Sequence, residues 1–114
     1  MRSEKEVLER FKEYGKVYHI YDERGCVAWR TGTGDNIELI YIESSEKGNG
    51  AKLFKDFLSR IKPYHSVYVF HLASNPAGAF YEKMGLKNKV SSGIYRNDDT
   101  ILRWETYDNL RKAD

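Results

Sequence analysis

Two glycines followed by an amphipathic helix make up the stretch that decides the fold, Gly48-Asn49-Gly50-Ala51-Lys52-Leu53-Phe54. Glycine lets the backbone turn tightly and lets a ligand approach it closely. The apolar positions that follow recur with helical spacing, at Leu53, Phe54, Phe57, Leu58 and Ile61. Pro63 predicts the end of this helix. The free amides of a helix start carry partial positive charge, so the stretch suits a phosphate or a diphosphate.

The residues before the glycines predict a helix and three strands. Ser3 and Glu6 form a capping-box pattern that starts a helix, and Gly15 ends it. The apolar period then changes to two, which predicts strands over 16–22, 26–31 and 36–43. Within the third strand we expect Ile37, Leu39 and Tyr41 on one face and Ile40 and Ile42 on the other.

The residues after the glycine helix predict a strand, a short helix and a last hairpin. The run 67–73 is apolar at nearly every position, as in a strand buried on both faces. Asn75 and Pro76 predict the start of a short helix that Gly85 closes. Two strands follow at 90–95 and 101–106, across a turn at 97–99. The element order α-β-β-β-α-β-α-β-β predicts an α/β (α+β) fold in a single domain over residues 1–114.

The composition is that of a globular protein, with 40% hydrophobic and 32% charged residues. No apolar run approaches the roughly 18 residues that a membrane span needs, so we expect no membrane association. The charged start of the chain does not resemble a signal peptide, and Cys26, the single cysteine, suits a reducing compartment. These features predict a cytoplasmic protein. The formal net charge of +2 does not favour nucleic acid as a partner.

The glycine loop alone also fits a plain tight turn between a strand and a helix. It lacks the Gly-Lys-Ser/Thr ending of a Walker loop, and Leu53 stands where a dinucleotide fingerprint has its third glycine. The histidines and the cysteine show no metal-ligand spacing, so we expect no metal. No Ser-His-Asp or Cys-His arrangement follows from the spacing either.

A second motif, C-terminal to the glycine loop, favours a ligand-binding role for the loop over a plain turn. After the next strand the chain reads Phe80-Tyr81-Glu82-Lys83-Met84-Gly85-Leu86. With the glycine loop, this segment resembles the GNAT family of N-acetyltransferases over residues 36–106. The resemblance implies a GNAT-like mixed sheet of about six strands flanked by helices. The chain would be N-terminally shortened, because one helix precedes its first strand where the family has a strand and two helices. Ser45 stands at the family's Gln/Arg position, so the usual contact to the pyrophosphate region is either missing or supplied by Lys47 or Lys52.

The resemblance also implies the cosubstrate and how it is held. An amine would attack the thioester of acetyl-CoA directly. The pantetheine arm would pair with the backbone of Ile40, Tyr41 and Ile42, and Phe80 would belong to the same site. Asn75 would contact the pantetheine or cap its helix. The pyrophosphate would bind the amides of the loop, at Lys47, Gly48, Asn49, Gly50, Ala51 and Lys52.

Two side chains are candidates for proton transfer in this reaction. An amine with a pKa near 10.4 costs about 4.6 kcal/mol to deprotonate at pH 7, so a base is useful. The resemblance favours Glu38, with Glu43 or a water as competitor, although Glu38 is also a plausible solvated strand carboxylate. Tyr81 matches the family's general acid, which protonates the leaving thiolate. The alternative for Tyr81 is a packing role in its helix.

The acceptor would be a primary amine, in a small molecule or at a lysine or N-terminus of a peptide or protein. The sequence leaves open monomer or homodimer, and acetyl or a longer acyl group. It also leaves open two other functions. One is a CoA-binding regulatory module without turnover, and the other is a small nucleic-acid-binding domain built on tyrosines and lysines.

Overall fold

The structure, a computed structural model, describes residues 2–62, 65–72, 77–91 and 101–105, with side chains described for 2–62, 65–70 and 77–87. The elements follow in the predicted order, with one added 3₁₀ turn, η1: α1 (Glu4–Arg10), η1 (Lys12–Tyr14), β1 (Tyr18–Asp22), β2 (Gly25–Thr31), β3 (Asn36–Ser44), α2 (Asn49–Arg60), β4 (Ser66–Leu72), α3 (Gly78–Lys83), β5 (Lys87–Ser91) and β6 (Ile101–Glu105).

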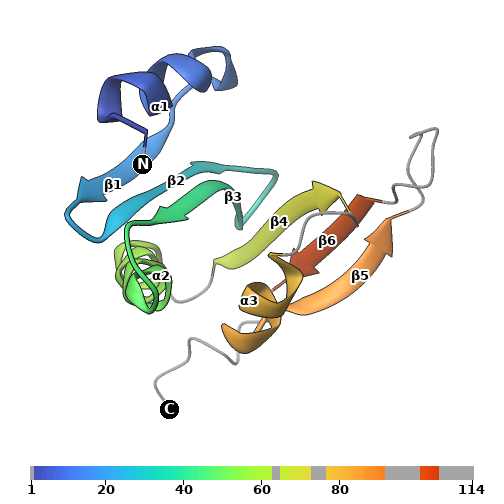
Figure 1. The fold of residues 1–114 in the computed structure, drawn as a ribbon. Helices are drawn as coiled ribbons and strands as arrows, with labels where there is room; N and C mark the ends of the chain where they lie inside the picture. Colours follow the sequence, from blue (N-terminus) through green and yellow to red (C-terminus); the bar gives the residue numbers. More distant parts are fainter. Residues whose placement is uncertain (1, 63–64, 73–76, 92–100, 106–114) are drawn as a thin grey trace.

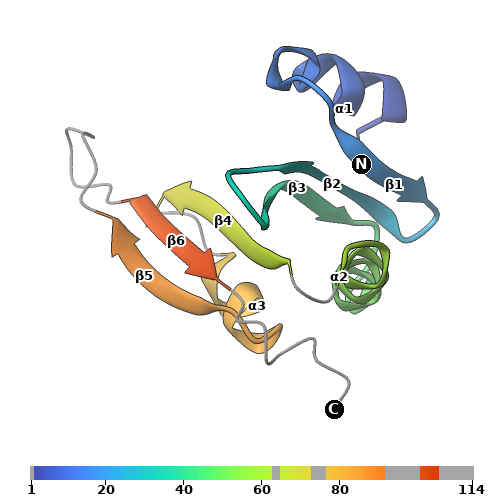
Figure 2. The same ribbon diagram turned by 180° about the vertical axis from the view of Figure 1, so that it is seen from behind.

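All six strands form one mixed sheet in the order β1-β2-β3-β4-β6-β5. Strands β3 and β4 are parallel, and the other neighbouring pairs are antiparallel. Helix α1 lies on one face of the sheet, and α2 and α3 lie on the other (Figures 1 and 2). The predicted α/β fold, a six-stranded mixed sheet flanked by helices, is confirmed.

The larger core lies between the sheet and the pair α2 and α3. Its fully buried side chains include Leu53, Phe54 and Phe57 of α2, which pack against Val27 and Val67 of the sheet. Each such side chain contributes about 1.5–3 kcal/mol when it leaves water. The apolar stripe predicted for α2 is therefore confirmed.

A smaller core lies under α1, where Val7 and Phe11 pack against Cys26. The predicted capping box is present, because Ser3 Oγ accepts from the Glu6 amide and Glu6 Oε1 accepts from the Ser3 amide. Leu8, on the same helix, is 42% exposed. A helix of two turns covers only a narrow strip of the sheet, so Val7 and Phe11 supply its buried apolar contacts.

Strand β3 carries a β-bulge that reverses the facing of its second half. Opposite β2, Ala28 pairs with Tyr41 and Trp29 pairs with Leu39, so Ile40 is the extra residue. Past an extra residue the alternation of side chains changes phase. Ile42 therefore packs with Leu39 in the larger core, whereas Ile40 and Tyr41 face α1. The expectation that Tyr41 shares a face with Leu39 was wrong for this reason.

The second half of the sheet departs from expectation in two places. Strand β4 was expected to be buried on both faces, but Phe70 is 48% exposed, while Val67 and Val69 are buried. Strand β5 starts at Lys87, three residues before the predicted 90–95, since it pairs with β6 directly after α3 ends. It is an edge strand, where lysines are common. Its polar first residues therefore lack the apolar alternation from which a strand is predicted. Asn75, Pro76 and the turn at 97–99 lie outside the described residues.

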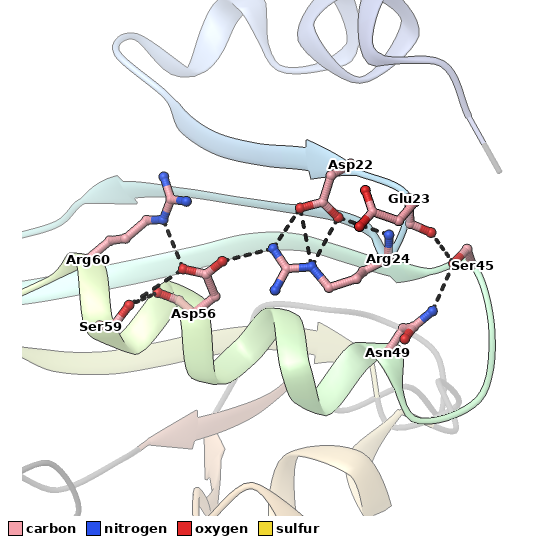
Figure 3. A network of polar contacts seen from close by, with 8 residues as sticks. All are labelled: Asp22, Glu23, Arg24, Ser45, Asn49, Asp56, Ser59 and Arg60. Atoms are coloured by element: carbon pink, nitrogen blue, oxygen red, sulfur yellow. Dashed lines mark hydrogen bonds and ion pairs between the residues drawn. The ribbon is translucent and has the colours of Figure 1, made fainter.

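A polar network ties the β1–β2 turn to α2 (Figure 3). Arg24 donates to both oxygens of Asp22, with Nη2–Oδ2 at 2.6 Å, and to Asp56 of α2, with Nη2–Oδ2 at 2.8 Å. Arg60 donates from Nε to Asp56 Oδ1 at 3.1 Å. Hydrogen bonds from Arg24 hold the pKa of the Asp22 and Asp56 carboxyls below their usual range.

The first prediction concerns the pH dependence of stability. Because the folded-state pKa values of Asp22 and Asp56 are depressed, their contribution is present above the unfolded pKa of about 3.9 and is lost as pH falls through the folded values. Arg24→Met should therefore be less stable than the wild type at pH 7, and the gap should narrow below about pH 4. Urea unfolding between pH 2.5 and 7 measures this. Arg60→Met, which removes only the outer pair, is the control and should show a smaller gap. Parallel pH curves for the wild type and Arg24→Met would contradict the assignment.

The second prediction concerns Gly25, which starts β2 with φ +133°. Gly25 pairs with Ser44 of β3, and a side chain here would collide with the carbonyl oxygen of the preceding residue, Glu43. Gly34 has φ +61° but nothing within 4 Å of an added Cβ. We expect Gly34→Ala to cost about 1–2 kcal/mol of backbone strain and Gly25→Ala to cost about 3 kcal/mol or more, because strain and collision add. Equal losses in urea unfolding would show that the collision relaxes away.

Candidate functional site

The site begins where β3 and β4 separate. Their parallel pairing among the described residues covers only Asn36–Ser66, Ile37–Val67 and Glu38–Tyr68. Strand β3 then continues to Ser44, while β4 continues to Leu72 and pairs with β6 on its other edge. Beyond Glu38 the facing backbone groups of the two strands therefore make no ladder with each other. An extended ligand that carries amides can pair with the backbone of β3 beyond Glu38.

We call the opening between β3 and β4 beyond Glu38 and Tyr68 the β3–β4 wedge. A cavity of about 490 Å³ lies beside this wedge, on the face of the sheet that α2 and α3 cover. It is walled by the end of β3, the start of α2 and by α3. Its wall is mostly small or apolar, and two lysines stand on it. The lining residues are Ile42, Ser44, Lys47, Gly48, Gly50, Ala51, Ala77, Ala79, Phe80, Lys83 and Met84.

The two glycines suit the local geometry for different reasons. Gly48 is the N-cap of α2 with φ +93°, a left-handed conformation, and no side chain caps the helix. A Cβ on Gly50 would lie 3.3 Å from Phe80 Cε1 and 3.7 Å from Ser44 Cβ, so a larger residue would fill the narrow space between them. The start of α2 therefore presents uncapped amides to a cavity that stays open because residue 50 has no side chain.

Most residues predicted to bind the cofactor lie on this cavity, namely Ile42, Lys47, Gly48, Gly50, Ala51 and Phe80. Others do not line it. Ile40 and Tyr41 pack toward α1, so only their backbone can face the wedge. Asn49 donates from Nδ2 to Ser45 Oγ at 3.1 Å, and Lys52 is exposed and does not line the cavity. Asn75 lies outside the described residues.

Sequence reasoning missed five lining residues: Ser44, Ala77, Ala79, Lys83 and Met84. Four belong to the segment around Phe80, and helical spacing could have found three of them. Phe80 and Met84, like Ala79 and Lys83, are four residues apart and so share a face of the helix. Ser44 could not be found in this way, because the bulge at Ile40 decides which face it occupies.

The two carboxylates considered as bases lie on the α1 face of β3. Glu38, 15% exposed, accepts from Arg30 Nε at 2.9 Å, and the Arg30 guanidinium lies 4.7 Å from the centre of the Tyr14 ring. Glu43 Oε1 accepts from Tyr41 Oη at 2.8 Å and from the Arg2 amide at 3.2 Å. Burial, together with the bond to Glu43, raises the pKa of Tyr41 to about 12. Each carboxylate therefore already has a polar partner.

Tyr81 lies in the larger core and is 8% exposed. Its ring packs edge to face on Phe80, with ring centroids 5.6 Å apart. Burial raises the pKa of its phenol, so the hydroxyl stays protonated at neutral pH, as a proton donor requires. The side chain adjoins Phe80 but does not line the cavity.

The described part of the chain gives little support for a metal site or for a cysteine nucleophile. There, no three His, Cys, Asp or Glu side chains are grouped to hold a metal ion. Burial raises the pKa of the Cys26 thiol to about 11, which leaves it a poor nucleophile. None of the described helices has the length and apolar character to cross a membrane.

The fold is shared with known acetyltransferase structures. A protein from Desulfovibrio desulfuricans assigned to the GNAT family superposes with a TM-score of 0.71 at 15% identity, over 91% of this chain and 77% of that one. A Bacillus subtilis acetyltransferase in complex with CoA gives a TM-score of 0.64 at 17% identity, over 90% and 83%. A Bacillus cereus acetyltransferase gives 0.60 at 13% identity, over 90% and 86%.

No protein-family model and no curated protein matches the sequence. At these identities the similarity concerns the fold. The chain has the fold of the GNAT acetyltransferases, with the glycine loop, the β3–β4 wedge and α3 around one cavity.

Proposed function

We propose that the chain is a GNAT-type N-acetyltransferase that transfers an acetyl group from acetyl-CoA to a primary amine. The observation that carries the proposal is the cavity between the uncapped start of α2 and α3, which opens at the β3–β4 wedge. Its volume of about 490 Å³ is that of a small-molecule site. The fold shared with an acetyltransferase in complex with CoA supports the same ligand here.

The parts of the site suit the parts of acetyl-CoA. The diphosphate would bind the amides of Gly50 and Ala51 near Lys47, where a helix start favours negative charge. The pantetheine arm, which carries two amides, would pair with the free edge of β3 at Ile40 to Ile42. This course leads the thioester toward the point where Glu38 and Tyr68 close the wedge.

Two proton transfers complete the proposed reaction. The amine nitrogen bonds to the thioester carbon while the bond from that carbon to sulfur breaks. Glu38, directly or through a water, would accept the proton from the amine, and Arg30 holds its carboxylate in place. Tyr81 would give its phenolic proton to the leaving thiolate, whose conjugate acid has a pKa near 8.5. The acceptor is any primary amine that reaches the wedge, and we propose a cytoplasmic location.

One observation favours a second function, a CoA-binding module without turnover. Both candidate bases already have partners, Glu38 with Arg30 and Glu43 with Tyr41. If neither carboxylate is released to accept a proton, the cavity would bind the cofactor without supporting transfer. Release of free thiol from acetyl-CoA across polyamines, amino acids, aminoglycosides and lysine peptides separates the two functions.

The third prediction tests the ligand. Acetyl-CoA at a hundredfold excess over its Kd should stabilise the fold by about 2.7 kcal/mol, a Tm increase on the order of 10 °C. Gly50→Val should remove this increase, because its side chain would occupy the space between Phe80 and Ser44. Gly34→Val, at a turn that does not line the cavity, is the control and should keep the increase. An undiminished increase in Gly50→Val would remove the loop from the site.

The fourth prediction concerns Tyr81. Tyr81→Phe removes one hydroxyl and keeps the ring against Phe80, so the fold should persist. If the hydroxyl protonates the thiolate, the single-turnover rate should fall about 10²–10⁴-fold. The Kd of acetyl-CoA should change little, because the proton is transferred only in the transition state. Normal turnover with a small change in stability would identify Tyr81 as a packing residue.

A further inference from the structure

Ser45 holds the glycine loop to the β1–β2 turn (Figure 3). Its amide donates to the Arg24 carbonyl at 2.9 Å, and its hydroxyl donates to the Glu23 carbonyl at 2.6 Å. The same hydroxyl accepts from Asn49 Nδ2 at 3.1 Å. Ser45 stands where the resembled family has glutamine or arginine. A short, uncharged side chain whose hydroxyl already makes two such bonds does not offer a phosphate the positive charge that an arginine there would.

The cavity receives positive charge from another place. Lys47 stands in the glycine loop and Lys83 in the last turn of α3, so the two come from different walls of the same cavity. Both side chains are exposed, and none of the ion pairs among the described residues involves either. The neighbouring acidic residues, Glu46 and Glu82, do not line the cavity.

We propose that Lys83 and Lys47 form a clamp on the diphosphate of the cofactor, with Lys83 supplying the contact that position 45 does not. The clamp rests on the proposed function and specifies how its site selects a phosphorylated ligand. A lysine is a compact charge on a flexible stem, so it can follow a diphosphate bound at the start of α2 from the opposite wall. The amides of Gly50 and Ala51 fix the position of the diphosphate, and the two lysines neutralise its charge.

The clamp makes recognition of the diphosphate dependent on salt and separable from recognition of the arm. Both lysines are exposed to solvent, so their attraction to phosphate is screened as ionic strength rises. The pantetheine arm pairs with uncharged backbone. Loss of a lysine should therefore weaken ligands that carry the diphosphate and leave a ligand without it unaffected.

The fifth prediction tests the clamp with three ligands, CoA, 3′-dephospho-CoA and S-acetylpantetheine, whose Kd values are measured at low and high salt. Lys83→Met and Lys47→Met should each weaken CoA and dephospho-CoA about tenfold at low salt, and less at high salt. Binding of S-acetylpantetheine should not change. Lys55→Met is the matched control, since Lys55 is exposed on α2 and does not line the cavity, and it should bind all three ligands as the wild type does.

Three outcomes would overturn the clamp. Wild-type affinity for CoA in Lys83→Met would remove the residue from the site. An equal loss for S-acetylpantetheine would show an effect on shape and not on charge. A loss confined to CoA, absent with dephospho-CoA, would place Lys83 at the 3′-phosphate and not at the diphosphate. The proposed function fails separately, if CoA binds with the expected lysine dependence but no amine is acetylated.

Discussion

One residue without a partner, Ile40 in β3, governs the arrangement of the candidate site. The bulge there sends Ile42 and Ser44 to the face of α2 and α3, where they line the cavity, and leaves Tyr41 and Glu43 toward α1. A bulge also increases the local twist of its strand. Strand β3 leaves its pairing with β4 just before this point, after Glu38. The extra residue and the wedge thus adjoin in one strand, and together they give the cavity its wall and its opening.

The glycine loop that follows β3 is held from outside the cavity. Ser45 bonds to the β1–β2 turn, and Arg24 of the same turn reaches Asp56 in the middle of α2. The β1–β2 turn itself depends on a glycine at position 25, because a side chain there would collide with the carbonyl oxygen of Glu43. Contacts that stabilise the N-terminal half of the sheet therefore also fix the direction in which α2 presents its uncapped amides. This leaves the cavity side of the loop free for a ligand.

Periodicity and turn chemistry were enough to predict the order of the elements and the glycine loop, because each depends on residues close together in the chain. The bulge could not be predicted in this way. The extra residue arises from how β3 pairs with β2. The run from Ile37 to Ile42 is mostly apolar, so its sequence fits a regular strand and a bulged strand equally well. The start of β5 was missed for a similar reason, since its polar residues are in a strand only through pairing with β6. The loop motif placed Gly48 and Gly50 on the cavity, whereas Lys83 became a candidate only when the structure brought α3 beside α2.

In the proposed reaction, the thioester and the Glu38 carboxylate must act on the same amine although they lie on opposite faces of the sheet. The cavity lies on the face of α2 and α3, whereas the Glu38 carboxylate lies on the face of α1, beside Arg30 and Tyr14. Paired strands stand about 4.8 Å apart and are joined by hydrogen bonds, so a continuous sheet separates groups on its two faces. The wedge past Glu38 and Tyr68 interrupts that separation, because β3 and β4 no longer bond to each other there. In the proposed reaction, a thioester led along the free edge of β3 from one face would meet the amine at this opening. Glu38 is the last residue of β3 that pairs with β4. For that reason Glu38 is the stronger candidate for the base than Glu43, which lies farther along the strand and is bound to Tyr41.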